Sequence, residues 1–266
     1  NWNVVAVGDV DGDTDMDFIF RNVASGYNRA WIMGPRPNGV NIFRETLTFF
    51  PRYGGPETSI VGMGDCNGDG TEDLYFWNNV TGVFRIWIMD FTGNRSGLGF
   101  FGAQGNLDME VQTVGDFDGD GDADIFWRDT VTGNNEIWDI NNVDCQQDGA
   151  ARAVASEATL AYNVVQAADM DNDGTEDLVW INSNNGQTKF WKMAAGDKSG
   201  ADIGWYGVPA DHAYAGTMDV DADGTINEDM VYYNNVTGRI RVMGTDGAFN
   251  RTRNVTSYAF GAGGAW

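Results

Sequence analysis

Five acidic segments recur along this chain at nearly even intervals. Their first aspartates are Asp9, Asp65, Asp116, Asp169 and Asp219, which places neighbouring copies 56, 51, 53 and 50 residues apart. A repeat of this period indicates that each copy forms one supersecondary unit and that neighbouring units bury a shared core. The chain of 266 residues, 42% of them hydrophobic, is long and apolar enough for such a core.

The acidic segments carry most of the net charge. The chain has 39 Asp and Glu against 16 Lys and Arg, and 24 of the acidic residues lie inside the five segments. The rest of the chain is therefore nearly neutral, and the net charge of −23 is concentrated in five clusters. An acidic chain without a basic patch disfavours nucleic acid as a partner.

Clustered aspartates repel each other unless a cation lies among them. The spacing Asp-x-Asp/Asn-x-Asp-x-x-x-Asp suits calcium, which takes roughly six to eight oxygen ligands. We expect one Ca²⁺ per loop, up to five, held by the side chains at positions 1, 3, 5 and 9 and by the residue at position 7, mainly through its carbonyl. The predicted metal residues are Asp9, Asp11, Asp13, Asp15 and Asp17; Asp65, Asn67, Asp69, Thr71 and Asp73; Asp116, Asp118, Asp120, Asp122 and Asp124; Asp169, Asp171, Asp173, Thr175 and Asp177; and Asp219, Asp221, Asp223, Thr225 and Asp229.

The loops do not fit an EF-hand, because that motif needs a glutamate at position 12 between two helices. Position 12 is Phe20, Phe76, Trp127 or Trp180 in the first four loops, and the flanking segments are aromatic and β-prone. We therefore expect calcium loops between strands. Asp/Gly turns without metal are the alternative interpretation. The fifth loop departs from the pattern, because Asp229 closes it two residues late.

Each repeat continues with two short strands joined by a five-residue turn that ends in glycine. The turns cover residues 22–26, 78–82, 129–133, 182–186 and 234–238. A terminal glycine suits the left-handed position of a hairpin loop. About 53 residues per repeat then hold four short strands, which is the size of one propeller blade. The predicted fold is all-β, a five-bladed β-propeller of four-stranded blades that forms a single domain over residues 1–266.

The two ends of the chain look like parts of one repeat. The segment FFGAQGN at 100–106 resembles AFGAGGA at 259–265. If residue 266 is followed by residue 1, as in a circle, both segments precede the next acidic loop by the same number of residues. We expect N- and C-terminal strands to close the ring, with Trp2 and Trp266 at the seam, which leaves no open sheet edge there. A tandem polymer, in which the last strand completes the next subunit, gives the same pattern.

The loops DFDGDGDADIFW and DMDNDGTEDLVW, with FFGAQG upstream, resemble FG-GAP/VCBS repeats. Such repeats occur in integrin alpha-chain propellers, in bacterial secreted and surface proteins and in some fungal lectins. The resemblance covers essentially the whole chain. It implies a β-propeller with calcium in each blade, extracellular placement, and adhesion or glycan binding. The family's metal positions correspond to Asp9, Asp11, Asp13 and Asp17 and to the matching residues of the other loops. This chain departs from the family at Asn67 and in the fifth loop, and integrin-like members usually have seven blades.

A tryptophan recurs five residues after the turn glycine. It is Trp31, Trp87, Trp138 and Trp191 in the first four repeats, and counting back from Met243 places Arg241 there in the fifth. One interpretation is packing between blades, since tryptophan has a large apolar body. The other is a stacking platform for sugar rings, one per blade.

No catalytic residue is predicted. The single histidine, His212, excludes a histidine metal cluster, and no serine lies in a nucleophile-elbow motif. A carboxylate pair such as Asp108 and Glu110 keeps glycoside hydrolysis open as a third reading. No apolar run reaches transmembrane length, so membrane insertion is not expected, and the absence of a signal-peptide pattern predicts a mature form if the protein is exported. Cys66 and Cys145 form one disulfide between blades two and three or stay reduced.

The preferred function is a secreted or cell-surface module that binds without catalysis. Its expected partner is carbohydrate or a cell-surface glycoprotein, and several similar blades would add avidity to weak sites. The alternative is a structural subunit of an extracellular filament, sheath or surface layer that self-associates. A glycan-cleaving enzyme is the weakest of the three hypotheses.

Overall fold

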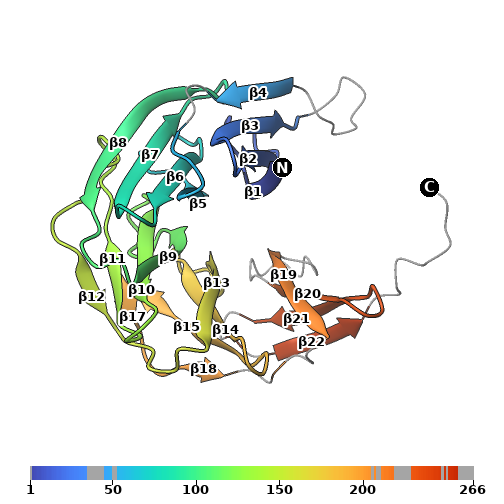
Figure 1. The fold of residues 1–266 in the computed structure, drawn as a ribbon. Coiled ribbons are helices and arrows are strands. Elements are labelled where there is room, and N and C mark those ends of the chain that lie inside the picture. Colours follow the sequence, from blue (N-terminus) through green and yellow to red (C-terminus); the bar gives the residue numbers. More distant parts are fainter. Residues whose placement is uncertain are drawn as a thin grey trace, which may run out of the picture. The chain divides into compact units, whose positions relative to one another are not determined.

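The structure is a computed structural model, and it describes residues 2–34, 45–49, 53–204, 207, 211–218, 229–246, 249 and 251–256. No residue in these ranges is helical, and the strands form five four-stranded antiparallel sheets in chain order (Figure 1). The predicted all-β fold with five four-stranded, propeller-like blades is confirmed. No described segment forms a helix that is long and apolar enough to cross a membrane.

The chain divides into two compact units. Unit 1 contains Asn1–Asp116 and Asp120–Ala158, and unit 2 contains Phe117–Gly119 and Thr159–Trp266. The first three sheets belong to unit 1 and the last two to unit 2.

The sheets of unit 1 each run from a first strand to an outer fourth strand. The first sheet contains β1 (Trp2–Gly8), β2 (Asp17–Asn22), β3 (Tyr27–Ile32) and β4 (Glu45–Phe49). The second contains β5 (Thr58–Gly64), β6 (Asp73–Asn78), β7 (Val83–Met89) and β8 (Arg95–Ala103). The third contains β9 (Met109–Gly115), β10 (Asp124–Asp129), β11 (Asn135–Trp138) and β12 (Arg152–Val154).

Unit 2 repeats this arrangement twice. Its first sheet contains β13 (Tyr162–Ala168), β14 (Asp177–Asn182), β15 (Thr188–Trp191) and β18 (Ile203–Gly204). A small hairpin of β16 (Met193–Ala194) and β17 (Asp197–Lys198) is inserted before β18. The second sheet contains β19 (His212–Met218), β20 (Asp229–Asn234), β21 (Ile240–Thr245) and β22 (Arg251–Thr256).

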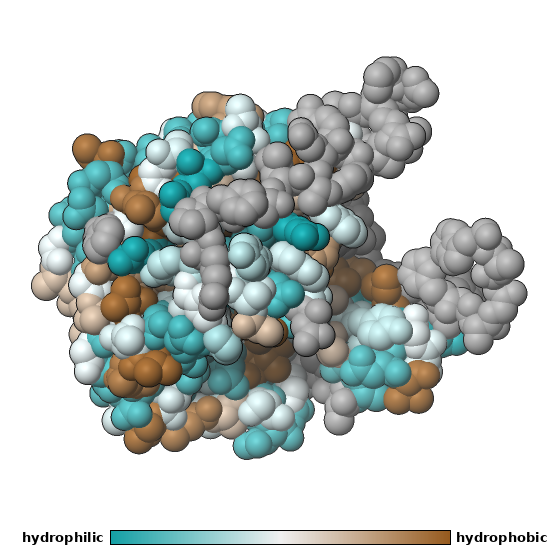
Figure 2. Space-filling view, turned by 45° about the horizontal axis from the view of Figure 1, so that its top comes forward, coloured by the Kyte–Doolittle hydropathy of each residue, from teal (hydrophilic) through white to brown (hydrophobic). Residues whose placement is uncertain are grey.

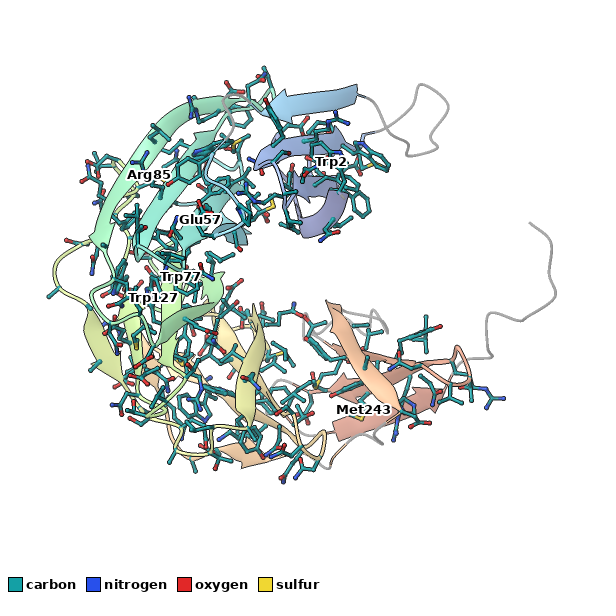
Figure 3. All side chains as sticks on the ribbon, viewed as in Figure 1. Trp2, Glu57, Trp77, Arg85, Trp127 and Met243 are labelled. Carbon is teal, nitrogen blue, oxygen red and sulfur yellow. A yellow bond between two sulfur atoms is a disulfide. The ribbon has the colours of Figure 1, made fainter. Side chains whose placement is uncertain are left out.

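The hydrophobic core lies between neighbouring sheets within each unit. In unit 1, the first strand β5 contacts the first strands β1 and β9 on either side, and one buried cluster joins the second and third sheets through Tyr75, Phe84 and Trp127. Trp77 lies edge-on to Trp127 with their ring centroids 5.8 Å apart (Figure 3). These contacts stabilise the sheets of unit 1 by burying aromatic faces against the next repeat.

On the molecular face in Figure 2, hydrophilic and hydrophobic residues are interspersed.

The predicted hairpin turns are confirmed in all five repeats. Each turn glycine donates its N–H to the carbonyl of the first turn residue, at 2.8 Å for Gly26, Gly82, Gly133 and Gly186 and 2.9 Å for Gly238. These glycines have φ between 67° and 79°, the left-handed region that other residues adopt only with strain. The turn fixes the register of each hairpin.

Every first strand carries a β-bulge a few residues before the acidic loop. The register shifts between Val4 and Ala6 in β1, and at the corresponding place in β5, β9, β13 and β19. A bulge bends its strand and increases the local twist. The five first strands are therefore bent at the same place, shortly before the acidic segment.

Cys66 and Cys145 form a disulfide. Cys66 follows β5 in the second sheet and Cys145 follows β11 in the third, so the bond joins the two blades that the sequence suggested. The predicted ring closure involves 259–266 and Trp266, which lie outside the described residues, and stays a prediction.

Candidate metal centres

The acidic loops connect the first and second strands of every sheet. Four loops are described in full, at residues 9–17, 65–73, 116–124 and 169–177. In the fifth, Asp219, Asp221, Asp223 and Thr225 lie outside the described residues, and Asp229 is the first residue of β20.

The backbone of each loop turns sharply at positions 4 and 6. Position 6 has a positive φ in all four loops: 74° at Thr14, 87° at Gly70, 92° at Gly121 and 89° at Gly174. Glycine adopts this conformation without cost, whereas a β-branched residue such as Thr14 is strained in it. Glycine therefore occupies the left-handed position without strain in loops two to four.

The opening aspartate organises the turn through backbone N–H groups. Asp9 accepts hydrogen bonds from Asp13 N at 3.0 Å and from Thr14 N at 2.7 Å. Asp169 accepts the equivalent bonds from Asp173 N at 3.1 Å and Gly174 N at 3.0 Å. These bonds fold the chain back over the carboxylate, so that the next aspartates gather around it.

The structure brings three carboxylates together in three of the described loops. Their oxygens lie within 4.8 Å of one another in Asp9, Asp11 and Asp13, in Asp116, Asp118 and Asp124, and in Asp169, Asp171 and Asp177. All nine are residues that the sequence predicted as metal ligands. Loop two, which has Asn67 at position 3, shows no such cluster of three carboxylates.

Position 7 belongs to the loop framework in the described loops. Its backbone N–H donates to the aspartate at position 5, as in Asp15 N to Asp13 at 3.0 Å and Asp122 N to Asp120 at 3.0 Å. Where position 7 is threonine, the hydroxyl donates to the same carboxylate, as Thr71 Oγ1 does to Asp69 at 2.6 Å. In the two threonine loops this leaves the carbonyl of the residue as its contribution to a metal.

The closing aspartate has a second role that the sequence did not reveal. Asp73 is fully buried and accepts hydrogen bonds from Cys66 N at 3.0 Å and from Met89 N at 2.8 Å. Met89 lies 16 residues further on, at the end of β7, and the same spacing recurs at Asp17, Asp124, Asp177 and Asp229. The carboxylate thus joins the start of the loop to the end of the next strand.

Burial makes these carboxylates costly to ionise. Desolvation raises the pKa of Asp17 to about 6, and that of Asp73 and Asp177 to about 7, although backbone N–H groups oppose the shift. Glu72, which follows position 7 of loop two, has its pKa raised to about 7 by burial and by the nearby charge of Asp9. A divalent cation in the loops would offset both effects, because it stabilises ionised carboxylates.

Loop four contains a cation of its own. The Nζ atom of Lys192, between β15 and β16, forms ion pairs with Asp171 and, at 2.9 Å, with Asp173. These hydrogen bonds raise the pKa of the lysine, so its ammonium stays charged. The corresponding residue is Ile32 in the first repeat and Ile88 in the second. The loop sequence does not reveal Lys192, because this residue lies outside the loop and contacts it only after the sheet forms.

The residues present fit a calcium ion. The donors are carboxylate and carbonyl oxygens, which calcium prefers. One atom in loop four is also left unused, since Asp171 Oδ1 is buried and has no hydrogen-bond partner among the described residues. A buried acceptor in that state is costly unless a ligand reaches it.

The recurring tryptophans pack against the aromatic residue at position 12 of their own repeat. Their ring centroids lie 4.5 Å apart for Trp31 and Phe20, 4.6 Å for Trp87 and Phe76, 4.7 Å for Trp138 and Trp127, and 4.6 Å for Trp191 and Trp180. Trp87, Trp138 and Trp191 are buried, whereas Trp31 is 44% exposed. Of the four, Trp31 is the one whose side chain is exposed to solvent.

The predicted equivalence of Arg241 to these tryptophans is wrong. Trp31 pairs with Phe18, which follows the closing aspartate Asp17. In the fifth repeat the residue that follows Asp229 is Met230, and its strand partner is Met243 (Figure 3). Arg241 pairs instead with Tyr232, as Arg29 does with Phe20. The turn glycine fixes the hairpin register, so counting must start from Gly238 and not from the following methionine.

Two buried arginines were also missed by the sequence analysis. Arg128 donates from Nη1 to Gly133 O at 3.3 Å and from Nη2 to Glu157 O at 2.9 Å. Arg21 makes the equivalent contacts in the first repeat, to Gly26 O and Tyr53 O. Each guanidinium thus ties the hairpin turn to the chain that leads out of the sheet.

Comparisons with known proteins support the repeat and the fold. Residues 116–180, which include loops three and four, match the family described as FG-GAP-like repeat. No curated protein sequence matches the chain. The resemblance seen in the sequence is therefore confirmed for this part of it.

Solved structures share the fold at low identity. The Tc holotoxin pore of Photorhabdus luminescens matches with a TM-score of 0.60 and 15% identity, over 99% of this chain but 13% of the toxin chain. A periplasmic gluconolactonase of Pseudomonas aeruginosa matches with a TM-score of 0.51 and 10% identity, over 97% of this chain and 86% of the enzyme. A Lactobacillus plantarum protein matches with a TM-score of 0.50 and 12% identity, over 91% of this chain and 68% of that protein. Likeness at this identity shows the fold alone.

Proposed function

We propose that this chain is an extracellular calcium-binding β-propeller that recognises carbohydrate and catalyses no reaction on it. The observation that carries the proposal is the acidic loop, in which three carboxylates converge on one point in three repeats. Calcium bound there would supply the counter-charge that lets the loops hold their shape. The ion would be held by the aspartates at positions 1, 3, 5 and 9 and by the carbonyl at position 7.

Two features support an extracellular site of action. The disulfide between Cys66 and Cys145 is a bond that persists in oxidising compartments. Calcium at millimolar concentration, as found outside cells, is enough to load sites of modest affinity.

The metal claim is tested by counting ions. The double variant Asp118→Ala/Asp120→Ala removes two ligands of loop three, so it is expected to bind one calcium ion fewer than the parent protein. Chelation of the parent is expected to lower its melting temperature, because an ion that binds only the folded state stabilises it. An unchanged melt in chelator, or an unchanged ion count in the variant, overturns the proposal.

The carbohydrate claim is tested on a broad glycan array, in calcium and in chelator, with protein whose assembly mass has been measured. Calcium-dependent binding to one sugar class supports the proposal. A large polymer that binds no glycan indicates the structural subunit instead. Because a gluconolactonase shares the fold, the same protein is assayed with gluconolactone, and calcium-dependent hydrolysis would overturn the non-enzymatic assignment.

A further inference from the structure

One surface pocket in unit 1 differs in chemistry from the acidic loops. It has a volume of about 470 Å³ and lies where the chain leaving β8 meets the hairpin of β10 and β11. Its polar lining includes Gln104, Asn106, Asn134 and Glu136, and its apolar lining includes Met109 and Val154. The volume lies within the range of small-molecule sites in proteins.

Glu136 occupies a position that is basic in every other repeat. The residue opposite the position-12 aromatic is Arg29, Arg85, Lys189 and Arg241 in repeats one, two, four and five. In the third repeat Glu136 pairs with Trp127 at this position. A charge reversal confined to one of five copies indicates that this copy has a requirement the others lack.

The aromatic ring that contacts the basic residue in repeats one and four is also absent from the third repeat. In repeat one the Arg29 guanidinium lies 4.3 Å from the centroid of Trp2, and in repeat four Lys189 Nζ lies 4.4 Å from that of Tyr162. The strand position of Trp2 and Tyr162 is taken by Met109 in the third repeat. The space that a stacked cation and aromatic ring fill in repeats one and four is therefore left open beside Glu136.

The polar groups of the pocket are held in fixed orientations. Glu136 Oε1 accepts hydrogen bonds from Gln104 Nε2 at 2.7 Å and from Trp138 Nε1 at 3.0 Å. No hydrogen bond to its other oxygen, Oε2, is formed within the described part of the chain. Ser156 Oγ donates to Asn134 Oδ1 at 2.9 Å, which leaves the Asn134 amide N–H groups as donors at the rim.

Asp129 also lines the pocket, but both of its carboxylate oxygens already accept hydrogen bonds from the protein. Its Oδ1 accepts backbone N–H groups of Val131 and Thr132, and its Oδ2 accepts Asn106 Nδ2 at 2.9 Å. These bonds, led by that of Thr132 N, hold the pKa of Asp129 below its usual range, so it stays charged. Two carboxylates and no basic residue line the pocket, which disfavours phosphate, sulfate and uronate groups.

We propose that this pocket binds one unit of an uncharged saccharide, with Glu136 Oε2 and the Asn134 amide engaging neighbouring hydroxyl groups. A hydroxyl group both donates and accepts, so a vicinal pair satisfies a carboxylate oxygen and an amide N–H together. Met109 and Val154 offer apolar contact to the C–H face of the ring. The inference rests on the proposed function and assigns its carbohydrate site to the third repeat.

The test uses the full chain in millimolar calcium and a panel of uncharged methyl glycosides, with binding followed by calorimetry and by backbone amide shifts. Glu136→Arg installs the residue of the other repeats and is expected to lower the affinity at least tenfold, while Glu136→Gln, which keeps the shape, is expected to lower it less. Arg29→Gln changes the matching position of the first repeat and is expected to leave the affinity unchanged. Ligand-induced shifts are expected at 104–106 and 134–136.

The outcomes separate the two proposals. Binding that Glu136→Arg abolishes, with an unchanged calcium count and melting temperature, supports the pocket. Binding that is equal in the parent and in both Glu136 variants, with shifts elsewhere, overturns the pocket and leaves the proposed function in place. If no glycoside binds to the folded, calcium-loaded parent, the carbohydrate assignment and the pocket fall together.

Discussion

At the scale of single residues, the loops combine one required chemistry with local differences. All four described loops place acidic or amide oxygens at positions 1, 3 and 5, yet Asn67 replaces an aspartate in loop two and Lys192 approaches loop four. These differences predict that the sites have different calcium affinities. A tethered ammonium resembles a calcium ion in its charge sign and its preference for oxygen, but it cannot replace the ion's full coordination.

Replacing Lys192 with methionine is expected to raise the calcium affinity of loop four by roughly fivefold to tenfold. The ion must displace the lysine from Asp171 and Asp173, and a partly exposed ion pair is worth about 1 kcal/mol. Calcium titration by calorimetry measures the change. Lys198→Met, which removes a lysine paired with Asp202 outside the loop, is the control. Equal affinities in the parent and in Lys192→Met would refute the competition.

Replacing Thr14 with glycine is expected to stabilise the protein by about 0.5–1 kcal/mol. Thr14 has a φ of 74°, and relief of left-handed strain is worth about 1–2 kcal/mol. Part of this gain is lost because glycine makes the unfolded chain more flexible. Urea unfolding gives the difference. The reverse change in loop two, Gly70→Thr, is expected to destabilise, and a neutral result for both would show that the loop backbone relaxes freely.

At the scale of strands and sheets, the blade is a hairpin pair held by polar contacts at both ends. The closing aspartate joins the loop to the residue 16 positions further on, and Arg21 and Arg128 hold the turns at the opposite end. Neighbouring blades of unit 1 are joined by Glu72 N to Asp9 O and by Ala123 N to Asp65 O, both at 2.9 Å. Loops one and two therefore each depend on the next blade for one hydrogen bond.

Removing the disulfide is expected to destabilise unit 1 by about 4 kcal/mol. The bond closes a segment with a sequence separation of 79, and the loss of unfolded-state restriction scales with the logarithm of that length. The double variant Cys66→Ala/Cys145→Ala is compared with the parent in urea. Reductant is expected to lower the urea unfolding midpoint of the parent and to leave that of the double variant unchanged. An unfolding midpoint that is the same in both proteins would show that the bond adds nothing to stability.

At the scale of the whole molecule, stability depends on the balance between buried carboxylates and cations. The metal-free protein is expected to lose stability as the pH rises from about 4 to about 7. The pKa of Asp73 and Asp177 is about 7 in the folded state against an ordinary 3.8, so the folded chain binds more protons than the unfolded chain over this range. The contribution is fully present below about pH 4.

This pH dependence is measured as the melting temperature of dialysed, metal-free protein at several pH values, and then with calcium added. Calcium is expected to reverse the trend, because it binds the ionised carboxylates more tightly as protons leave. A metal-free melting temperature that rises between pH 4 and 7 would contradict the raised pKa values.

The sequence alone determined the features that depend on neighbours along the chain. Local spacing predicts the five repeats and the strands on either side of each loop. It also predicts the glycine turn at 22–26, the four equivalent turns, and the convergent aspartates of loop one. A hydrogen bond across four residues or a carboxylate at every second position is a short-range property of the backbone, so a pattern of residues suffices to predict it.

Only the tertiary structure decided which distant residues meet. Strand pairing brought the Asp177 carboxylate to Met193 and the Lys192 ammonium to loop four. Folding of unit 1 chose the disulfide over two free thiols and opened the space beside Glu136. These contacts depend on register and on packing between sheets, which cooperative burial fixes and which no local spacing encodes.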